Sequence, residues 1–461
     1  MYIDDTIAAI ATPPGIGGVS IIRVSGKDAF SLVDSIFQSA GSLPLKERPN
    51  KTVQYGHIIN PKTGDTLDEV ILLLMQGPHS YTAEDVVEIQ CHGGIVSTRA
   101  ILTLLTSLGI RLAEPGEFTK RAFLNGRIDL TQAEAIIDII EAKTEDSLSL
   151  AVKQLDGTVS SFVNDLRENL ISMIAHLEVT IDYPEEDIEE VSSQEVGQQL
   201  QPILRQMDQL LSTANTGRLI RDGISAVIVG RPNAGKSSLM NALLRENRAI
   251  VTDIPGTTRD SIEEYMNIEG ISLRLVDTAG LRHTDDQVEA IGVQKAREYA
   301  DKADIILCVI DASKELSEEE RNILQDVSGK HTIVLLNKSD LGSVVTPSMI
   351  QELGEFVAVE PISAAQGQGS SVISKWVKDL VYGGQVSADH SAMLSNVRHI
   401  SLMKEAKSYL DQAVENISLG MPIDFIATDL RSAWEALGQI TGDSLRESMV
   451  DELFSRFCLG K

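Results

Sequence analysis

The sequence has few cysteines, few basic residues and no long apolar run, and each shortage excludes a class of protein. Three cysteines, Cys91, Cys308 and Cys458, are too few and too scattered for a disulfide framework or a zinc site. Cys308 lies in the apolar run 305–310 and is expected in a core. No apolar run approaches membrane-spanning length, and residues 1–5 lack the features of a signal peptide. We therefore expect a cytoplasmic protein without a membrane partner.

Basic residues are outnumbered by acidic ones, 40 against 67, which gives a formal net charge of −27. Such a surface repels nucleic acid, so any role on RNA requires a local basic patch or a basic partner. The acidic loop 182–190 is interpreted as a solvated connection rather than a metal site.

Residues 230–237, Gly-Arg-Pro-Asn-Ala-Gly-Lys-Ser, form a phosphate-binding motif. The motif follows an apolar run, 226–229, and precedes a helical stretch, 238–244, as a strand–loop–helix phosphate site requires. Its glycines allow backbone N–H groups to converge on phosphates, and the positive end of the helix faces the same anion. Lys236 is predicted to reach the β- and γ-phosphates and Ser237 to ligate Mg²⁺. The alternative is an ordinary glycine-rich turn.

Two further motifs follow in the order typical of GTPases, Asp-Thr-Ala-Gly at 277–280 and Asn-Lys-Ser-Asp at 337–340. The first ends an apolar run, where the Asp277 carboxylate can orient the Mg²⁺ shell. In the second, Asp340 can accept two hydrogen bonds from guanine, which favours guanine over adenine about a hundredfold or more. Ser363 and Ala364 are expected to support the base from the other side. The predicted GTP-binding residues are Asn233, Ala234, Gly235, Lys236, Ser237, Ser238, Thr252, Asp253, Ile254, Pro255, Gly256, Thr257, Thr258, Asp277, Thr278, Ala279, Gly280, Asn337, Lys338, Ser339, Asp340, Ser363 and Ala364.

The sequence lacks the glutamine that many signalling GTPases place after the second motif, because Leu281 stands there. Another group must therefore orient the attacking water and neutralise the developing charge. Asn233, Arg282, Glu289 and the segment 252–260 are candidates, and Thr258 could complete the Mg²⁺ shell. A solvated helix charge is an equally good interpretation of Glu289.

The pattern of apolar residues predicts a multidomain α/β and α protein. Strands are expected at 6–11, 19–24, 70–75 and 86–91 and helices at 27–37 and 95–108, which together favour an α+β domain. A capping box at 131–134 introduces a helical region that resumes after about residue 395. The expected segments are an N-terminal α+β domain (1–125), a helical domain in two parts (126–222 and 384–461) and an inserted Ras-like P-loop α/β GTPase domain (223–383).

This combination resembles the bacterial and organellar tRNA-modification GTPases known as MnmE or TrmE. The resemblance covers the whole chain, and Leu459, where isoleucine is common, is a conservative departure. Its specific marks are Ala-Thr-Pro-Pro-Gly at 11–15, Gly93 and Gly94 after His92, Pro-Gly-Glu-Phe at 115–118, Arg-Ala-Phe-Leu-Asn at 121–125, and the tail Cys-Leu-Gly-Lys at 458–461.

The resemblance implies a function in which a flavoprotein, MnmG or GidA, brings FAD to a heterotetramer-like complex. The complex modifies C5 of the wobble uridine of certain tRNAs with an aminomethyl or carboxymethylaminomethyl group. It implies a homodimer formed through the N-terminal domain. It also implies a one-carbon donor, a 5-formyl- or 5,10-methylene-tetrahydrofolate, and by motif match the folate contacts are Arg23, Glu88, Arg127 and Lys461.

The resemblance also implies that a potassium ion replaces the arginine finger of other GTPases. By motif match the potassium ligands are Asn233, Thr252, Ile254 and Thr257. Glu289 matches the residue that positions the water, so the predicted catalytic residues are Glu289, Lys236 and Asn233. Cys458 matches a tail cysteine that is either a catalytic thiol or without a role. The alternatives are a ribosome-assembly or translation switch, and an N-terminal domain that only forms the dimer and binds no folate.

Overall fold

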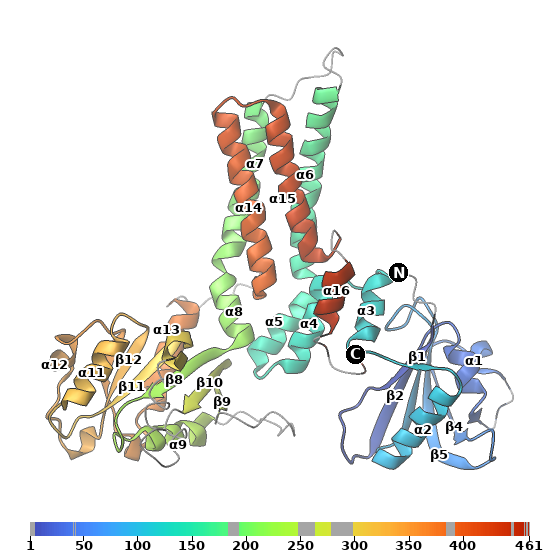
Figure 1. Cartoon of the computed structure of the whole chain (residues 1–461), viewed down its shortest axis with the longest axis horizontal. Coiled ribbons are helices and arrows are strands. Elements are labelled where there is room, and N and C mark those ends of the chain that lie inside the picture. Colours follow the sequence, from blue (N-terminus) through green and yellow to red (C-terminus); the bar gives the residue numbers. More distant parts are fainter. Residues whose placement is uncertain are drawn as a thin grey trace. The chain divides into compact units, whose positions relative to one another are not determined.

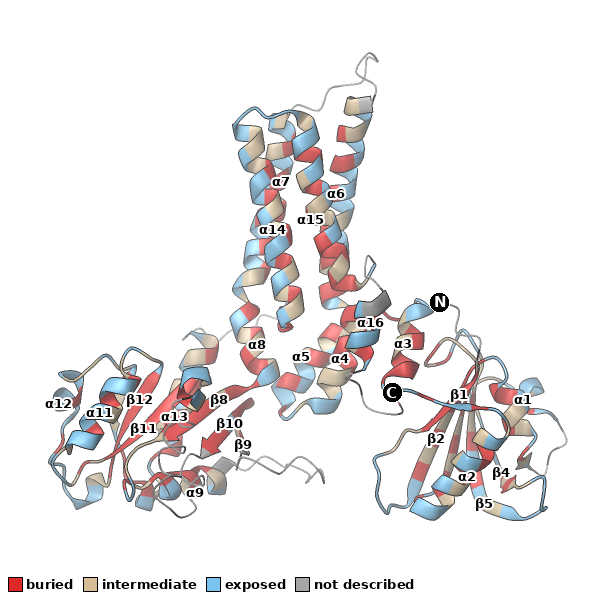
Figure 2. Ribbon diagram, in the orientation of Figure 1, coloured by how far each residue is buried: buried red, intermediate tan, exposed pale blue. Residues whose placement is uncertain are grey.

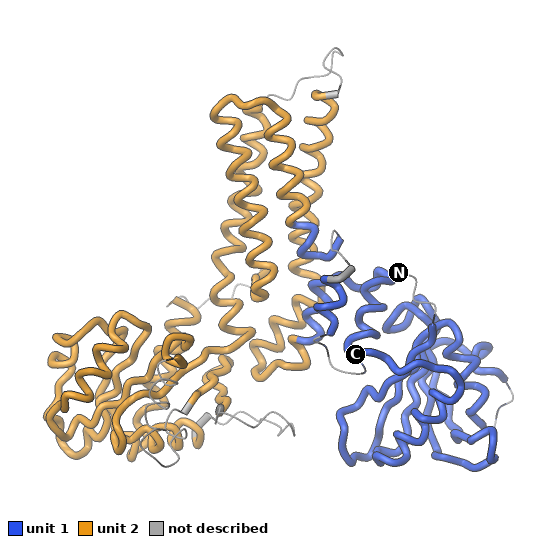
Figure 3. The backbone as a smooth tube through the Cα atoms, viewed as in Figure 1, with its two compact units in different colours: residues 1–137, 437–461 blue, residues 138–436 orange. Residues whose placement is uncertain are grey.

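The computed structural model describes residues 5–39, 41, 43–182, 193–247, 263–277, 298–383, 392–443, 447–455, 457 and 460. The chain divides into two compact units, residues 1–137 with 437–461, and residues 138–436 (Figure 3). Figure 1 labels the helices and strands of both units.

The first unit contains a mixed sheet in the order β3-β4-β5-β6-β2-β1-β7, antiparallel except where β7 joins β1. Buried and less buried residues alternate along β2, so Ile22 and Val24 enter the core and Arg23 points to the other face. Three of the strands, β3, β4 and β7, were not expected from the sequence. The strands are β1 (Ile7–Ile10), β2 (Val19–Ser25), β3 (Phe37–Gln38), β4 (Thr52–Ile59), β5 (Thr66–Met75), β6 (Val86–His92) and β7 (Arg111–Leu112).

Helices α1 and α2 cover one face of this sheet, and their apolar side chains share a core with β2, β5 and β6. Helix α1 is shorter than expected, since Phe37 lies in β3 instead. Helix α3 contacts α16, where a Cβ on Gly116 would collide with the Phe454 carbonyl. The helices are α1 (Ala29–Asp34), α2 (Ile95–Ser107), α3 (Glu117–Leu124), α16 (Glu447–Phe454) and the short 3₁₀ helix η1 (Leu45–Glu47).

The helical region consists of long amphipathic helices, with α7 packed on α14 (Figures 1 and 2). The expected capping box at 131–134 is wrong, because Thr131 is buried inside the helix. The helix is capped instead by Asp129, whose Oδ1 accepts from Gln132 N while Gln132 Oε1 accepts from Asp129 N. The helices are α4 (Leu130–Glu141), α5 (Glu145–Leu155), α6 (Thr158–Asp182), α7 (Ser193–Ser212), α8 (Ala214–Asp222), α14 (Val397–Ser418) and α15 (Ile423–Thr441).

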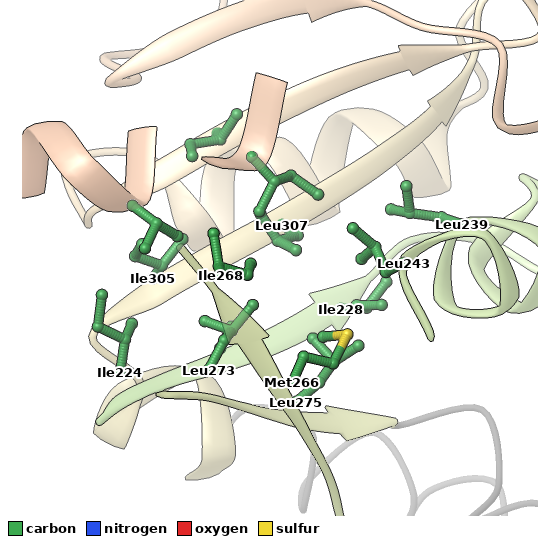
Figure 4. Close-up of a cluster of buried hydrophobic side chains, with 14 of the residues drawn as sticks. Ile224, Ile228, Leu239, Leu243, Met266, Ile268, Leu273, Leu275, Ile305 and Leu307 are labelled. Atoms are coloured by element: carbon green, nitrogen blue, oxygen red, sulfur yellow. The ribbon is translucent and has the colours of Figure 1, made fainter. Parts of the chain in front are cut away.

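Between α8 and α14 lies an α/β domain whose sheet has the order β13-β12-β11-β8-β10-β9, parallel except for β9. Its central strands are buried almost without interruption, as in sheets covered on both faces. Figure 4 shows side chains from β8, β9, β10, β11 and α9 that share one of the domain's cores. The elements are β8 (Ile224–Val229), α9 (Lys236–Asn247), β9 (Glu263–Ile268), β10 (Ile271–Asp277), β11 (Ile305–Asp311), α11 (Glu318–Val327), β12 (Thr332–Asn337), η3 (Ser339–Leu341), α12 (Pro347–Gln351), β13 (Ala358–Pro361), η4 (Ala364–Gln366) and α13 (Ser370–Tyr382).

Cys308 is completely buried in β11, and burial raises the pKa of its thiol to about 12, so its assignment to the core is confirmed. Across the described ranges, every helix is too short or too polar to cross a membrane.

Candidate functional site

The phosphate loop occupies the turn between β8 and α9, at the carboxyl edge of the parallel strands. Gly230 (φ 146°) and Gly235 (φ 102°) adopt backbone conformations that favour glycine. Neither position has room for a Cβ, because one at Gly230 would strike the Val309 carbonyl and one at Gly235 would strike Asn337 Nδ2. Close packing against two other strands therefore determines the shape of the loop.

Lys236 and Ser237 begin helix α9 directly after this loop. The buried Lys236 ammonium donates to the carbonyls of Gly230 and Arg231, each at 2.8 Å, and so lies across the mouth of the loop. Ser237 is exposed, and its hydroxyl has no hydrogen bond to another described residue. A cation at the loop and a hydroxyl without a partner among the described residues suit a phosphate with its metal ion.

Asn337 joins the base-recognition loop to the phosphate loop. Its Nδ2 donates to the Ala234 carbonyl at 2.8 Å, and its Oδ1 accepts from Ala364 N at 3.0 Å. The side chain is only 2% exposed, so both bonds are shielded from water. Asn337 therefore holds three separate segments in register.

Lys338 makes a second link between the same loops. Its ammonium donates to the Asn233 carbonyl at 2.8 Å and to Asp311 Oδ2 at 2.6 Å. Burial raises the pKa of Asp311, but bonds from Lys338 and Ser313 outweigh burial and lower it. Asn233 itself lies at φ 64°, an unusual value for a residue with a side chain, and its carbonyl is held there by Lys338.

The predicted base-binding carboxylate, Asp340, is exposed at the start of η3. Ser363 Oγ donates to its Oδ1 at 2.6 Å, and Ser339 Oγ donates to the Ile362 carbonyl at 2.9 Å. The bond from Ser363 holds one oxygen of the carboxylate, and the other oxygen accepts no hydrogen bond from another described residue. The structure thus brings the predicted phosphate and guanine residues to one edge of the sheet.

A magnesium ion at this edge suits the Ser237 hydroxyl, which has no hydrogen bond to another described residue. The backbone of Asp277 ends β10 opposite Ile228 of β8, the strand that enters the phosphate loop. Hydroxyl and carboxylate oxygens are the ligands that Mg²⁺ prefers. The other predicted residues of the nucleotide and ion sites lie outside the described residues: Thr252, Asp253, Ile254, Pro255, Gly256, Thr257, Thr258, Thr278, Ala279, Gly280, Arg282 and Glu289.

A second group of predicted residues meets on the face of the N-terminal sheet opposite α1 and α2. Arg23 of β2 and Glu88 of β6 are directly paired across the strands, and Arg23 Nε donates to Glu88 Oε1 at 2.9 Å. Arg23 also donates to the Gly460 carbonyl at 3.3 Å. Gly460 (φ 88°) packs closely on the Ile10 backbone, and Lys461, which follows it, lies outside the described residues.

Arg127 joins this group through Tyr81. Its NH1 donates to the Tyr81 carbonyl at 2.8 Å, and its guanidinium carbon lies 5.0 Å from the centre of the Tyr81 ring. No carboxylate in the described part of the chain forms a salt bridge with Arg127. The structure therefore brings together three of the four residues predicted to contact folate.

Beneath these residues lies a buried ionic network centred on Arg121 and Glu117 of α3. Arg121 NH2 donates to Glu117 Oε1 at 3.0 Å, and Arg111 NH1 donates to Glu117 Oε2 at 2.9 Å. Burial raises the pKa of Glu117, but these guanidinium bonds and the Glu114 N–H outweigh burial and lower it. The network fixes the start of α3 next to the segment that contains Tyr81.

Tyr81 and Asp311 were not predicted from the sequence. Asp311 ends β11 as Asp277 ends β10, so its position at a strand terminus was an available signal. Nothing in the pattern around Tyr81 distinguishes it from other tyrosines, because its contacts come from residues distant in sequence.

Comparisons with known proteins bear on the whole chain. Residues 6–127 match the family model for the GTP-binding protein TrmE N-terminus, and residues 130–458 match that for the MnmE helical domain. The chain is 48% identical over 458 residues to the tRNA modification GTPase MnmE of Geobacillus thermodenitrificans, covering 99% of each protein. It is 48% identical over 461 residues to that of Alkaliphilus oremlandii and 47% identical over 461 residues to that of Clostridioides difficile, covering 100% of each.

Among solved structures, the G domain of the T. maritima FeoB iron transporter is 23% identical, with a TM-score of 0.26, over 34% of this chain and 98% of that one. The α/β fold of this domain is instead identified from its strand order and from the loops at the carboxyl edge of its sheet.

Proposed function

Because the chain belongs to the MnmE family of tRNA-modification GTPases, we propose that it binds and hydrolyses GTP as part of tRNA modification. One observation supports this most directly: Asn337 and Lys338 connect the guanine loop to the carbonyls of the phosphate loop. Bound Mg²⁺ would neutralise charge on the phosphates. Lys236 would contact the β- and γ-phosphates, and Asp340 would select guanine. We also propose the division into segments 1–125, 126–222, 223–383 and 384–461.

We propose further that potassium activates hydrolysis through Asn233. The Asn233 side chain is exposed and makes no hydrogen bond to another described residue, so its amide oxygen is available as an ion ligand. Thr252, Ile254 and Thr257 would supply further oxygens, and Glu289 would help to position the water. Hydrolysis is expected to be faster in KCl than in NaCl, and this difference should vanish in Asn233→Ala. The matched control is Asn322→Ala, on the exposed surface of α11, and equal rates of the wild-type protein in both salts would refute the proposal.

We propose that Arg23, Glu88, Arg127 and Lys461 bind a reduced folate, 5-formyl- or 5,10-methylene-tetrahydrofolate. Glu88 could accept hydrogen bonds from the amidine-like edge of the pterin, and the cations could meet the anionic tail. An Arg127 guanidinium without a salt bridge to any described residue, in a chain of net charge −27, supports an anionic ligand. Titration with 5-formyltetrahydrofolate tests this proposal, and binding that is unchanged in Arg127→Ala would contradict it.

The cellular role that we propose is modification of wobble uridine at C5, in the cytoplasm, with a flavoprotein partner that carries FAD. The chain would act as a homodimer formed through its N-terminal domain. Its acidic balance favours a complex in which the partner, rather than this chain, would make most contacts to tRNA phosphates. Mass spectrometry of wobble nucleosides, with and without the gene, tests this role. Unchanged nucleosides in its absence would refute it.

A further inference from the structure

Tyr81 lies between the two arginines of the proposed folate site and contacts both. The guanidinium carbon of Arg23 lies 4.9 Å from the centre of its ring, and that of Arg127 lies 5.0 Å from the same point. Both distances are within the range of a cation–π interaction. Both guanidinium groups therefore contact the same aromatic ring.

The ring itself is held from several sides. Its hydroxyl is 2.8 Å from the hydroxyl of Thr119, a fully buried residue of α3. The next residue, Thr82, is also buried, and its carbonyl accepts from Asn125 Nδ2 at 2.7 Å. The Tyr81 backbone is held in turn by Arg127. Tyr81 is consequently a fixed support rather than a mobile surface side chain.

The chemistry of this support matters because an aromatic ring attracts cations without neutralising them. A carboxylate in the same place would pair with the arginines and compete with an anionic ligand. Arg23 already has one carboxylate partner, Glu88, at 2.8 Å. With Arg127 outside any salt bridge to a described residue, these three charged residues keep an excess of one positive charge for the ligand.

We infer that Tyr81 is a positioning residue of the folate site, which orients Arg23 and Arg127 toward the anionic groups of the ligand through its ring. This inference rests on the proposed folate function. The π face of the ring orients the two arginines, and the hydroxyl only anchors the ring to Thr119.

The test compares Tyr81→Leu and Tyr81→Phe in the full-length protein, titrated with 5-formyltetrahydrofolate by isothermal calorimetry. Tyr81→Leu removes both cation–π contacts and should weaken binding about fivefold to thirtyfold. Tyr81→Phe keeps the ring and should stay within about threefold of wild type. Tyr55→Leu is the matched control, because Tyr55 is an exposed tyrosine of β4 in the same domain. Thermal unfolding of each variant shows whether the fold is retained.

The outcomes separate the inference from the proposal beneath it. Unchanged affinity in Tyr81→Leu, with binding by the wild-type protein, would overturn only the role of Tyr81. Equal weakening in Tyr81→Phe and Tyr81→Leu would assign the effect to the hydroxyl and would also overturn it. Absence of binding by the wild-type protein would overturn the folate function itself.

Discussion

Replacing Gly235 by alanine should separate the guanine loop from the phosphate loop. A Cβ at this position would collide with Asn337 Nδ2, which donates to the Ala234 carbonyl at 2.8 Å. Asn337 has little room to move, because its Oδ1 is also bonded to Ala364 N and the side chain is buried. The substitution must therefore break at least one of these bonds or shift the loop.

The cost of Gly235→Ala has two parts. Alanine at φ 102° is strained, which costs about 1–2 kcal/mol. A buried Ala234 carbonyl that loses its donor costs a further 1–3 kcal/mol or so. Since the second part removes a contact between the two loops of the nucleotide site, it should weaken GDP binding roughly 5- to 150-fold.

The control for strain is Gly329→Ala, between α11 and β12. Gly329 also has a positive φ, 75°, but a Cβ there meets no atom within 4 Å. Binding of a fluorescent GDP analogue to both variants, with thermal unfolding measured alongside, isolates the loss of the Asn337 bond. If Gly235→Ala binds GDP as tightly as Gly329→Ala, the proposed link between the two loops is wrong.

Two further predictions concern recognition of the guanine base and the stability of the N-terminal domain at acidic pH. Asp340→Asn should lose GTP affinity about a hundredfold and gain affinity for XTP, because an amide can donate to the 2-oxo group of xanthine. Competition binding with both nucleotides checks this. A retained preference for GTP would argue against Asp340 as the residue that recognises the base. The pKa of Glu117 is lower in the folded state than its ordinary value of 4.5. The ionised carboxylate therefore stabilises the folded state above pH 4.5, and this contribution is lost as the pH falls through the pKa of the folded state. Glu117→Gln should therefore be less stable at neutral pH and lose less stability on acidification, as urea unfolding at several pH values would show; identical pH profiles would contradict this.

Local sequence patterns predicted the nucleotide-binding domain well, because its signals are local. The apolar runs that become β8, β11 and β12 are buried on both faces, and such strands appear in the sequence as continuous apolar segments. Gly230 and Gly235 also signal their role, since close packing at both positions excludes a side chain. The phosphate and guanine motifs were therefore visible before the fold was known.

Other features depend on contacts that the sequence does not display. Burial alternates along β4, but the apolar Val53 and Tyr55 lie on its exposed side. The hydrophobicity of the sequence therefore does not mark β4 as a half-buried strand. The start of α4 was misplaced because Asp129 competes with Thr131 as the cap, and the choice is settled by burial of Thr131. Tyr81 gains its role only when β2 and the segment after α3 approach it.

The links made by Asn337 and Lys338 have a practical meaning for redesign of nucleotide preference. Both residues belong to the motif that reads the base, yet each holds a main-chain oxygen of the loop that grips the phosphates. A substitution of either residue that adapts the site to another nucleotide would alter turnover as well as selectivity. Asp340 is better suited to such a change, because its hydrogen bond with Ser363 does not involve the phosphate loop.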